Sequence, residues 1–162
     1  MTYLERLKIS QEYIAKILAS LLVCVLCICS NAQARIVDTS KAVIHHSDSG
    51  DVSAEEIDRW HKANTYYDKR TKTMKHWSGI GYHYVIRSNG DIEEGRNIKK
   101  KGAHAPKRGR NWWVGIVLTG RDTFTDKQIS SLKRLLAKLK VQTVERHHEE
   151  CPGQGIDVES LL

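Results

Sequence analysis

The sequence of 162 residues has no apolar run long enough to cross a membrane comfortably. Its longest run, Ile17 to Cys29, has thirteen residues, whereas a transmembrane helix needs about twenty. Lysines precede this run and Asn31-Ala32-Gln33-Ala34 follows it, a pattern typical of a secretory signal peptide cleaved after Ala34. We therefore expect residues 1–34 to be a signal peptide and the protein to be exported, periplasmic or secreted, without stable membrane insertion. An uncleaved anchor is the alternative, because the segment before the run is long and carries two glutamates.

Cysteine is scarce outside this apolar run. Cys24, Cys27 and Cys29 lie inside it, so the mature chain would keep only Cys151 and could form no internal disulfide. An unpaired thiol in an exported protein is open to oxidation unless something occupies it. Metal ligation would occupy it, and this favours a ligand role for Cys151.

The sequence also lacks internal repeats, a linker and any nucleic-acid-binding motif. A formal charge of +7 and a pI near 9.3 would suit a polyanionic partner, whether nucleic acid, anionic lipid or an acidic cell wall. The lysines and arginines are scattered rather than gathered into a stripe, so we expect no nucleic-acid partner. Residues 35–162 are long enough to bury a core, and we expect them to form one monomeric domain.

Three short runs predict strands of a buried sheet. The run from Lys41 to Ser47 carries His45 and His46 near its end, and Val114 to Thr119 is apolar throughout, as expected of a central strand buried on both faces. Val141 to Arg146 predicts a last strand that brings His147 to the same sheet edge. Polar residues at the ends of core strands are where open α/β sheets place their sites.

Capping boxes at Ser53 and Thr125 predict the starts of two helices. The first is expected to run to about Lys69 with Trp60 on its inner face, followed by an irregular basic loop over residues 70–78. Residues 79–86 predict a strand with Tyr82, Tyr84 and Ile86 on one face, and the pair at 89–90 predicts a hairpin turn into residues 91–95.

The stretch Arg146-His-His-Glu-Glu-Cys-Pro-Gly153 brings two imidazoles and a thiol together. Neutral imidazole and thiolate are the usual ligands of zinc, and a catalytic zinc takes three protein groups and leaves one position open. The alternative is a surface histidine pair beside a buried structural cysteine. A structural zinc in a basic nucleic-acid-binding protein is a further alternative, but it would need a fourth protein ligand.

Six blocks of the sequence occur in the order seen in bacteriophage amidase lysozymes and in animal peptidoglycan recognition proteins. The blocks are Val43–Ser47, Gly79–Tyr84, Gly90–Arg96, Gly102–Ala105, Gly115–Gly120 and His147–Gly153. The chain resembles this family over nearly all of residues 35–162. The resemblance implies an α/β single domain with a central mixed sheet flanked by helices, and a zinc beside a peptidoglycan-binding groove. It also implies N-acetylmuramoyl-L-alanine amidase activity, which cleaves the amide between muramic acid and the first L-alanine of the stem peptide.

The family motifs carry over to individual residues. By this resemblance the zinc ligands are His45, His147 and Cys151, and the catalytic tyrosine is Tyr82. We also expect His46, Arg96 and His104 to be substrate-binding residues, and His104 is a further candidate proton donor.

The chain departs from the family in the loop before Cys151. The family usually has a longer loop here, with a Lys or Thr two places before the cysteine that assists catalysis, whereas this chain has Glu149. An acid cannot replace a cation or hydroxyl donor that steadies an oxyanion. Glu149 or Glu150 is instead a candidate general base, as glutamates are in other zinc hydrolases. A non-catalytic peptidoglycan-binding module of the same fold is the alternative, although the complete ligand set argues against it.

Overall fold

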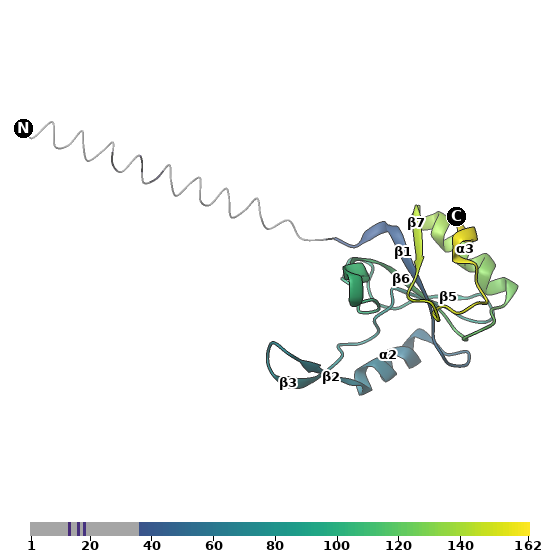
Figure 1. Cartoon of the computed structure of the whole chain (residues 1–162), viewed down its shortest axis with the longest axis horizontal. Coiled ribbons are helices and arrows are strands. Elements are labelled where there is room, and N and C mark those ends of the chain that lie inside the picture. The colour runs from purple at the N-terminus through teal and green to yellow at the C-terminus, as the bar shows by residue number, and fades with distance from the viewer. Residues whose placement is uncertain (1–12, 14–15, 17, 19–35) are drawn as a thin grey trace, which may run out of the picture. The chain divides into compact units, whose positions relative to one another are not determined.

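A five-stranded mixed sheet forms the centre of residues 36–162 in the computed structural model (Figure 1). The strand order is β5-β4-β6-β1-β7, and only β4 and β5 are antiparallel neighbours. The strands are β1 (Asp38–His46), β4 (Tyr84–Ile86), β5 (Ile92–Glu94), β6 (Trp113–Leu118) and β7 (Thr143–Arg146). The expected mixed sheet and the central position of β6 are confirmed.

The structure describes residues 13, 16, 18 and 36–162. The expected signal peptide lies almost entirely outside this part of the chain, and so does the alternative anchor. Among the described residues, no helix combines the length and the apolar character needed to span a membrane.

The two long helices cover opposite faces of the sheet (Figure 1). Helix α3 (Asp126–Leu139) begins at the predicted capping box of Thr125 and Gln128, and its leucines pack with β1, β4 and β6 in the larger buried cluster. Helix α2 (Ala54–Ala63) is capped by Ser53 and contributes Ile57 to a smaller cluster with Val85 and Val117. Because the helices cover both faces of the sheet, the ends of the strands stay open for a site. Two short 3-10 helices, η1 (Lys107–Trp112) and η2 (Val158–Leu161), complete the unit.

The prediction of a long first helix followed by an irregular loop was wrong. Helix α2 ends at Ala63, because Asn64 is already extended with φ −78° and ψ 145°. Residues beyond it form an antiparallel hairpin of β2 (Thr65–Asp68) and β3 (Thr73–His76). The β-branched and aromatic residues that open β2 favour a strand over a helix. Trp60, predicted to lie in the core, is 39% exposed.

The strand predicted over residues 79–86 begins only at Tyr84. The alternation of side chains therefore does not extend back to Tyr82, which packs against the smaller cluster, whereas Tyr84 and Ile86 pack in or against the larger one. A Cβ at Gly81 would overlap the backbone of Ala103, so glycine permits the close approach of these two segments. Tyr82 consequently lies on the face of the sheet that α2 covers.

Candidate active site

Neighbouring parallel strands bring the three predicted metal ligands together. His45 is the penultimate residue of β1 and His147 directly follows β7, and the His147 N–H donates to the Ile44 carbonyl at 3.2 Å. Cys151 returns to the same place, and its Sγ accepts the His46 N–H at 3.4 Å. The possible ligand atoms of His45, His147 and Cys151 all lie within 4.8 Å of one another.

The chemistry of these donors fits zinc. Around a zinc ion with bonds of about 2.0–2.3 Å, the ligand atoms lie roughly 3.5 Å apart, and the His45 Nδ1 to Cys151 Sγ distance is 4.0 Å. Burial, and then the neighbouring histidines His104 and His147, hold the pKa of His45 well below its usual value, so its imidazole is neutral. Burial raises the pKa of the Cys151 thiol, which the His46 N–H partly offsets. A bound cation would compensate the charge of the buried thiolate.

His104 fixes which nitrogen of His45 faces the cluster. His104 Nε2 lies 3.3 Å from the Trp113 carbonyl, which can only accept, so this nitrogen carries the proton. His104 Nδ1 then accepts from His45 Nε2–H at 3.0 Å, and His45 Nδ1 keeps its lone pair. Burial lowers the pKa of His104 to about 3, which keeps its ring neutral in this arrangement. The nitrogen of His45 that lies beside Cys151 Sγ, Nδ1, is therefore the one that carries the free lone pair.

Two glycines make room for the His104 ring. A Cβ at Gly102 or at Gly115 would overlap this ring, so both positions require glycine for the ring to lie between them. The Asn111 side-chain oxygen accepts the backbone N–H groups of His104 at 2.8 Å and of Ala105 at 2.7 Å. Both ring nitrogens of His104 thus have protein partners, and a substrate contact by this residue stays a prediction.

Tyr82 lies beside the metal cluster. Its ring centroid is 5.0 Å from that of His45 and 5.6 Å from that of His61. Burial, reinforced by the charge of Cys151, raises the pKa of Tyr82 to about 12. No hydrogen bond joins its hydroxyl to another residue in the described part of the chain. The protonated hydroxyl is suited to donate to a ligand and poorly suited to act as a base.

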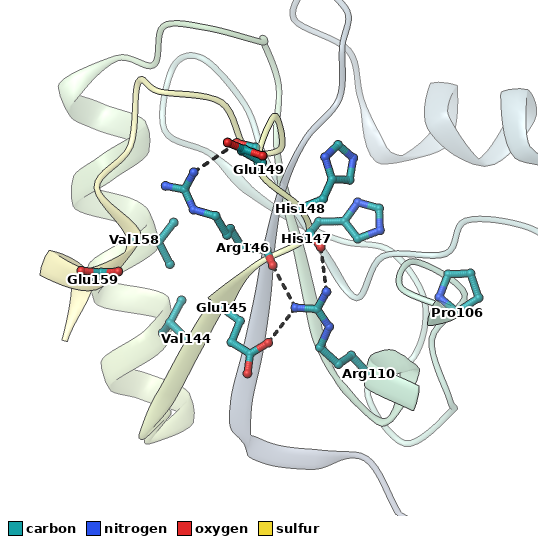
Figure 2. A pocket seen from close by; sticks show the side chains of 10 residues that line it. All are labelled: Pro106, Arg110, Val144, Glu145, Arg146, His147, His148, Glu149, Val158 and Glu159. Atoms are coloured by element: carbon teal, nitrogen blue, oxygen red, sulfur yellow. Dashed lines mark hydrogen bonds and ion pairs between the residues drawn. The ribbon is translucent and has the colours of Figure 1, made fainter. Parts of the chain in front are cut away.

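Arg110 supports the end of the strand that precedes His147, a role that no pattern in the sequence predicted. The guanidinium is buried and donates through Nη1 to Glu145 Oε2 at 2.7 Å and to the Arg146 carbonyl at 2.9 Å. Nη2 donates to the His147 carbonyl at 2.7 Å, and Figure 2 shows all three contacts. Because η1 carries Arg110 and closely follows His104, one stretch of chain supports both histidines that are predicted to be ligands.

A cavity of about 1090 Å³ opens beside His147 (Figure 2). Its lining residues come from η1, from β7 and the loop that follows it, and from η2: Pro106, Arg110, Val144, Glu145, Arg146, His147, His148, Glu149, Val158 and Glu159. Figure 2 shows Glu149 on the Arg146 side of the chain, whereas the rings of His147 and His148 point the other way. The Glu149 side chain is exposed, and its carbonyl accepts from Arg146 Nη1 at 3.2 Å.

Two other expected substrate-binding residues make contacts within the protein. His46 Nε2 lies 3.1 Å from the Glu150 carbonyl and joins the end of β1 to the loop of Cys151. Arg96 donates through Nε to the Ile80 carbonyl at 2.8 Å and through Nη1 to the Lys101 carbonyl at 3.2 Å. The two Arg96 bonds join the segment of Ile80 to that of Lys101, and a substrate contact by His46 or Arg96 stays a prediction.

Comparisons with known proteins agree with the fold and with the activity that the sequence resemblance implied. A family model described as N-acetylmuramoyl-L-alanine amidase matches residues 35–154. The endolysin of Klebsiella phage KP32 is 32% identical over 130 residues, which cover 71% of this chain and 78% of the endolysin. The solved N-acetylmuramoyl-L-alanine amidase LysC from Clostridium intestinale superposes with a TM-score of 0.60 at 31% identity, over 75% of this chain and 81% of that one.

A second solved relative belongs to the animal branch of the same fold. Drosophila PGRP-LB superposes with a TM-score of 0.57 at 25% identity, over 75% of this chain and 78% of that one. A variant of PGRP-LB has been solved in complex with tracheal cytotoxin. The family match spans most of the unit that carries the site, so the resemblance noted in the sequence is confirmed. The chain belongs to the N-acetylmuramoyl-L-alanine amidase family, whose members hydrolyse peptidoglycan.

Proposed function

We propose that the chain performs its family's reaction with a zinc ion held by His45, His147 and Cys151. The observation that supports this most directly is the convergence of the three donors, with the His45 lone pair directed into the cluster through His104. Zinc, when bound, supplies Lewis acidity that polarises a carbonyl and lowers the pKa of water. The reaction adds water across the amide, so that the muramic acid lactyl group gains the oxygen and the L-alanine amine gains the proton.

The protein's own groups have separate tasks in this reaction. Tyr82 donates its hydroxyl proton in a hydrogen bond to the oxygen of the scissile carbonyl, where negative charge develops as the carbon becomes tetrahedral. His104 accepts from His45, and Arg110 donates to the backbone carbonyl of His147, so these two residues hold the two histidines in position. The proton for the leaving amine comes from water, with Glu149 or Glu150 as the candidate carrier. The cavity beside His147 is lined by this ligand but by neither Tyr82 nor Cys151, so it borders the donor cluster on one side only.

The test combines metal analysis with identification of the bond that opens. The zinc-loaded protein is incubated with purified peptidoglycan, and mass spectrometry is expected to find free L-alanine amino termini and intact lactyl groups. Cys151→Ala is expected to lose both zinc and hydrolysis, whereas the matched control His148→Ala is expected to keep both, since His148 lies outside the donor cluster. Full zinc occupancy in Cys151→Ala would refute the ligand assignment. Zinc binding with no cleavage by the unmodified protein would instead favour a binding-only module.

We also propose that residues 1–34 direct export and are then removed, because the family's substrate lies outside the cytoplasm. N-terminal sequencing of exported protein is expected to begin at Arg35. Exported protein that begins at Met1 would favour the anchor.

A further inference from the structure

The β2–β3 hairpin, Thr65–His76, stands apart from the folded core (Figure 1). It pairs with no strand of the five-stranded sheet, and none of its residues belongs to either buried cluster among the residues that the structure describes. It also falls outside the six sequence blocks shared with the family. The hairpin is therefore not needed to build the sheet or the metal cluster, although a two-stranded hairpin is only marginally stable alone.

Large apolar side chains are exposed on this hairpin and beside it. Tyr67 and Met74 are cross-strand partners, so they lie on one face, and they are 56% and 61% exposed. Trp60, near the end of α2, is 39% exposed. Exposed apolar area costs roughly 25 cal/mol per Å² relative to burial, so the adjacent exposed pair of Tyr67 and Met74 indicates a surface that binds a partner.

The turn of the hairpin adds positive charge to this surface. Lys69, Arg70 and Lys72 are exposed, and none of them forms an ion pair with another residue in the described part of the chain. Asp68 is the only acidic residue between Thr65 and His76, and it forms an ion pair with Lys75 at 2.7 Å. The surface thus offers apolar side chains next to uncompensated cations, which suits a ligand that carries both apolar faces and carboxylates.

The base of the hairpin is joined to the active site. The Trp77 N–H donates to the Asn64 carbonyl at 3.3 Å, and the Trp77 ring packs on Tyr66 with centroids 4.8 Å apart. In the last turn of α2, His61 Nδ1 accepts the Gly81 N–H at 3.0 Å and its ring contacts Tyr82. The same turn of helix therefore fixes the start of the hairpin and borders Tyr82.

We propose that the β2–β3 hairpin is a second binding surface for polymeric peptidoglycan, separate from the site that cuts the amide. This inference rests on the proposed function. The C–H faces of the sugar rings pack on Tyr67 and Met74, and the carboxylates of the stem peptides lie against Lys69, Arg70 and Lys72. An anionic membrane would match the charges, but its lipids would have no reason to bind beside Tyr82. The hairpin retains the enzyme on the polymer between cleavage events.

The experiment compares binding to the polymer with cleavage of a small soluble substrate. One variant, Tyr67→Ser with Met74→Ser, removes the apolar pair, and a second, with Lys69, Arg70 and Lys72 replaced by Gln, removes the charges. The matched control replaces Lys127, Lys133 and Lys138 by Gln, which removes the same charge from exposed positions on α3. Each protein is sedimented with insoluble peptidoglycan and assayed on a soluble N-acetylmuramoyl peptide.

We expect each hairpin variant to lose about tenfold or more in affinity for the insoluble polymer, while kcat/KM on the soluble peptide stays within about twofold. Circular dichroism checks that the variants are folded. Equal sedimentation of the hairpin variants and the unmodified protein would overturn the proposal, and so would an equal loss in the α3 control. The hairpin variants are also tested on phosphatidylglycerol vesicles. If they lose binding to the vesicles but sediment normally with peptidoglycan, the surface binds membranes and the proposal is overturned. Failure of the proposed function would differ, since the unmodified protein would not cleave the soluble peptide.

Discussion

Replacing His104 tests whether the metal site depends on a residue that does not touch the metal. His104→Leu removes the acceptor that His45 Nε2–H has in this buried setting. An unsatisfied buried donor costs about 1–3 kcal/mol, and His45 can avoid this cost by turning or by moving its proton to Nδ1. Either change removes the lone pair from the cluster. We therefore expect zinc affinity to fall by about ten- to a hundredfold, the loss typical of ligand-orienting residues.

The assay is competition between the protein and a chelator of known zinc affinity, measured at equilibrium. His104→Asn is the informative second variant, because its side-chain oxygen can stand near the place of Nδ1 and accept from His45. The orienting role predicts that Asn restores much of the affinity, whereas a role in packing alone predicts that Asn is no better than Leu. His148→Ala, on the exposed side of the loop, is the control. Unchanged affinity in His104→Leu would refute the reasoning.

Three further predictions concern the chemistry and the pH dependence. Tyr82→Phe keeps the ring and is expected to retain zinc while kcat falls by about a hundredfold or more, the loss of one oxyanion donor; near-normal turnover would remove Tyr82 from the reaction. Glu149→Gln is expected to reduce kcat less than Tyr82→Phe, because its carboxylate is exposed and lies on the Arg146 side; a collapse of kcat would assign it the general-base role. The metal-free protein is expected to lose stability as pH falls from about 6.5 towards 3, because the lowered pKa of His104 keeps it neutral in the folded state while it is protonated in the unfolded chain. The expected slope is about 1.4 kcal/mol per pH unit for each such histidine, and urea unfolding at pH 7 and pH 5 measures it, with a flat profile as the contrary result.

The existence of strands β1 and β6 was predictable from the sequence because it depends on local patterns. The apolar composition of two runs predicted the strands β1 and β6. The histidines lie at the end of β1, which is where α/β sheets usually have their functional sites. The capping box at Thr125 fixed the start of α3 in the same local way. The meeting of His45, His147 and Cys151 followed from family order, and the parallel pairing of β1 with β7 gives it a physical reason.

Contacts between distant segments were not predictable in this way. Nothing local in the sequence distinguishes Arg110 from its neighbours in a basic loop, because its role depends on the carbonyls at the end of β7, 36 and 37 residues away. The partner of His104 is likewise 59 residues away. The hairpin after α2 was missed for a different reason: its residues have no apolar periodicity, since neither of its faces is buried in the core.

The turn before Cys151 shows why the ligands could be inferred while the assisting group could not. His148 and Cys151 close this turn, with each N–H donating to the other's carbonyl at 3.2 and 3.0 Å, and Glu149 and Glu150 form the exposed tip. The position of Cys151 Sγ depends on the base of the turn, where the His46 N–H also holds it. The length of the tip can therefore vary without displacing Cys151 Sγ. The position of a side chain at the tip is not fixed by the base of the turn, and it depends on the length of the loop. Tyr82, fixed by packing beside His45, is the donor whose position does not depend on that length.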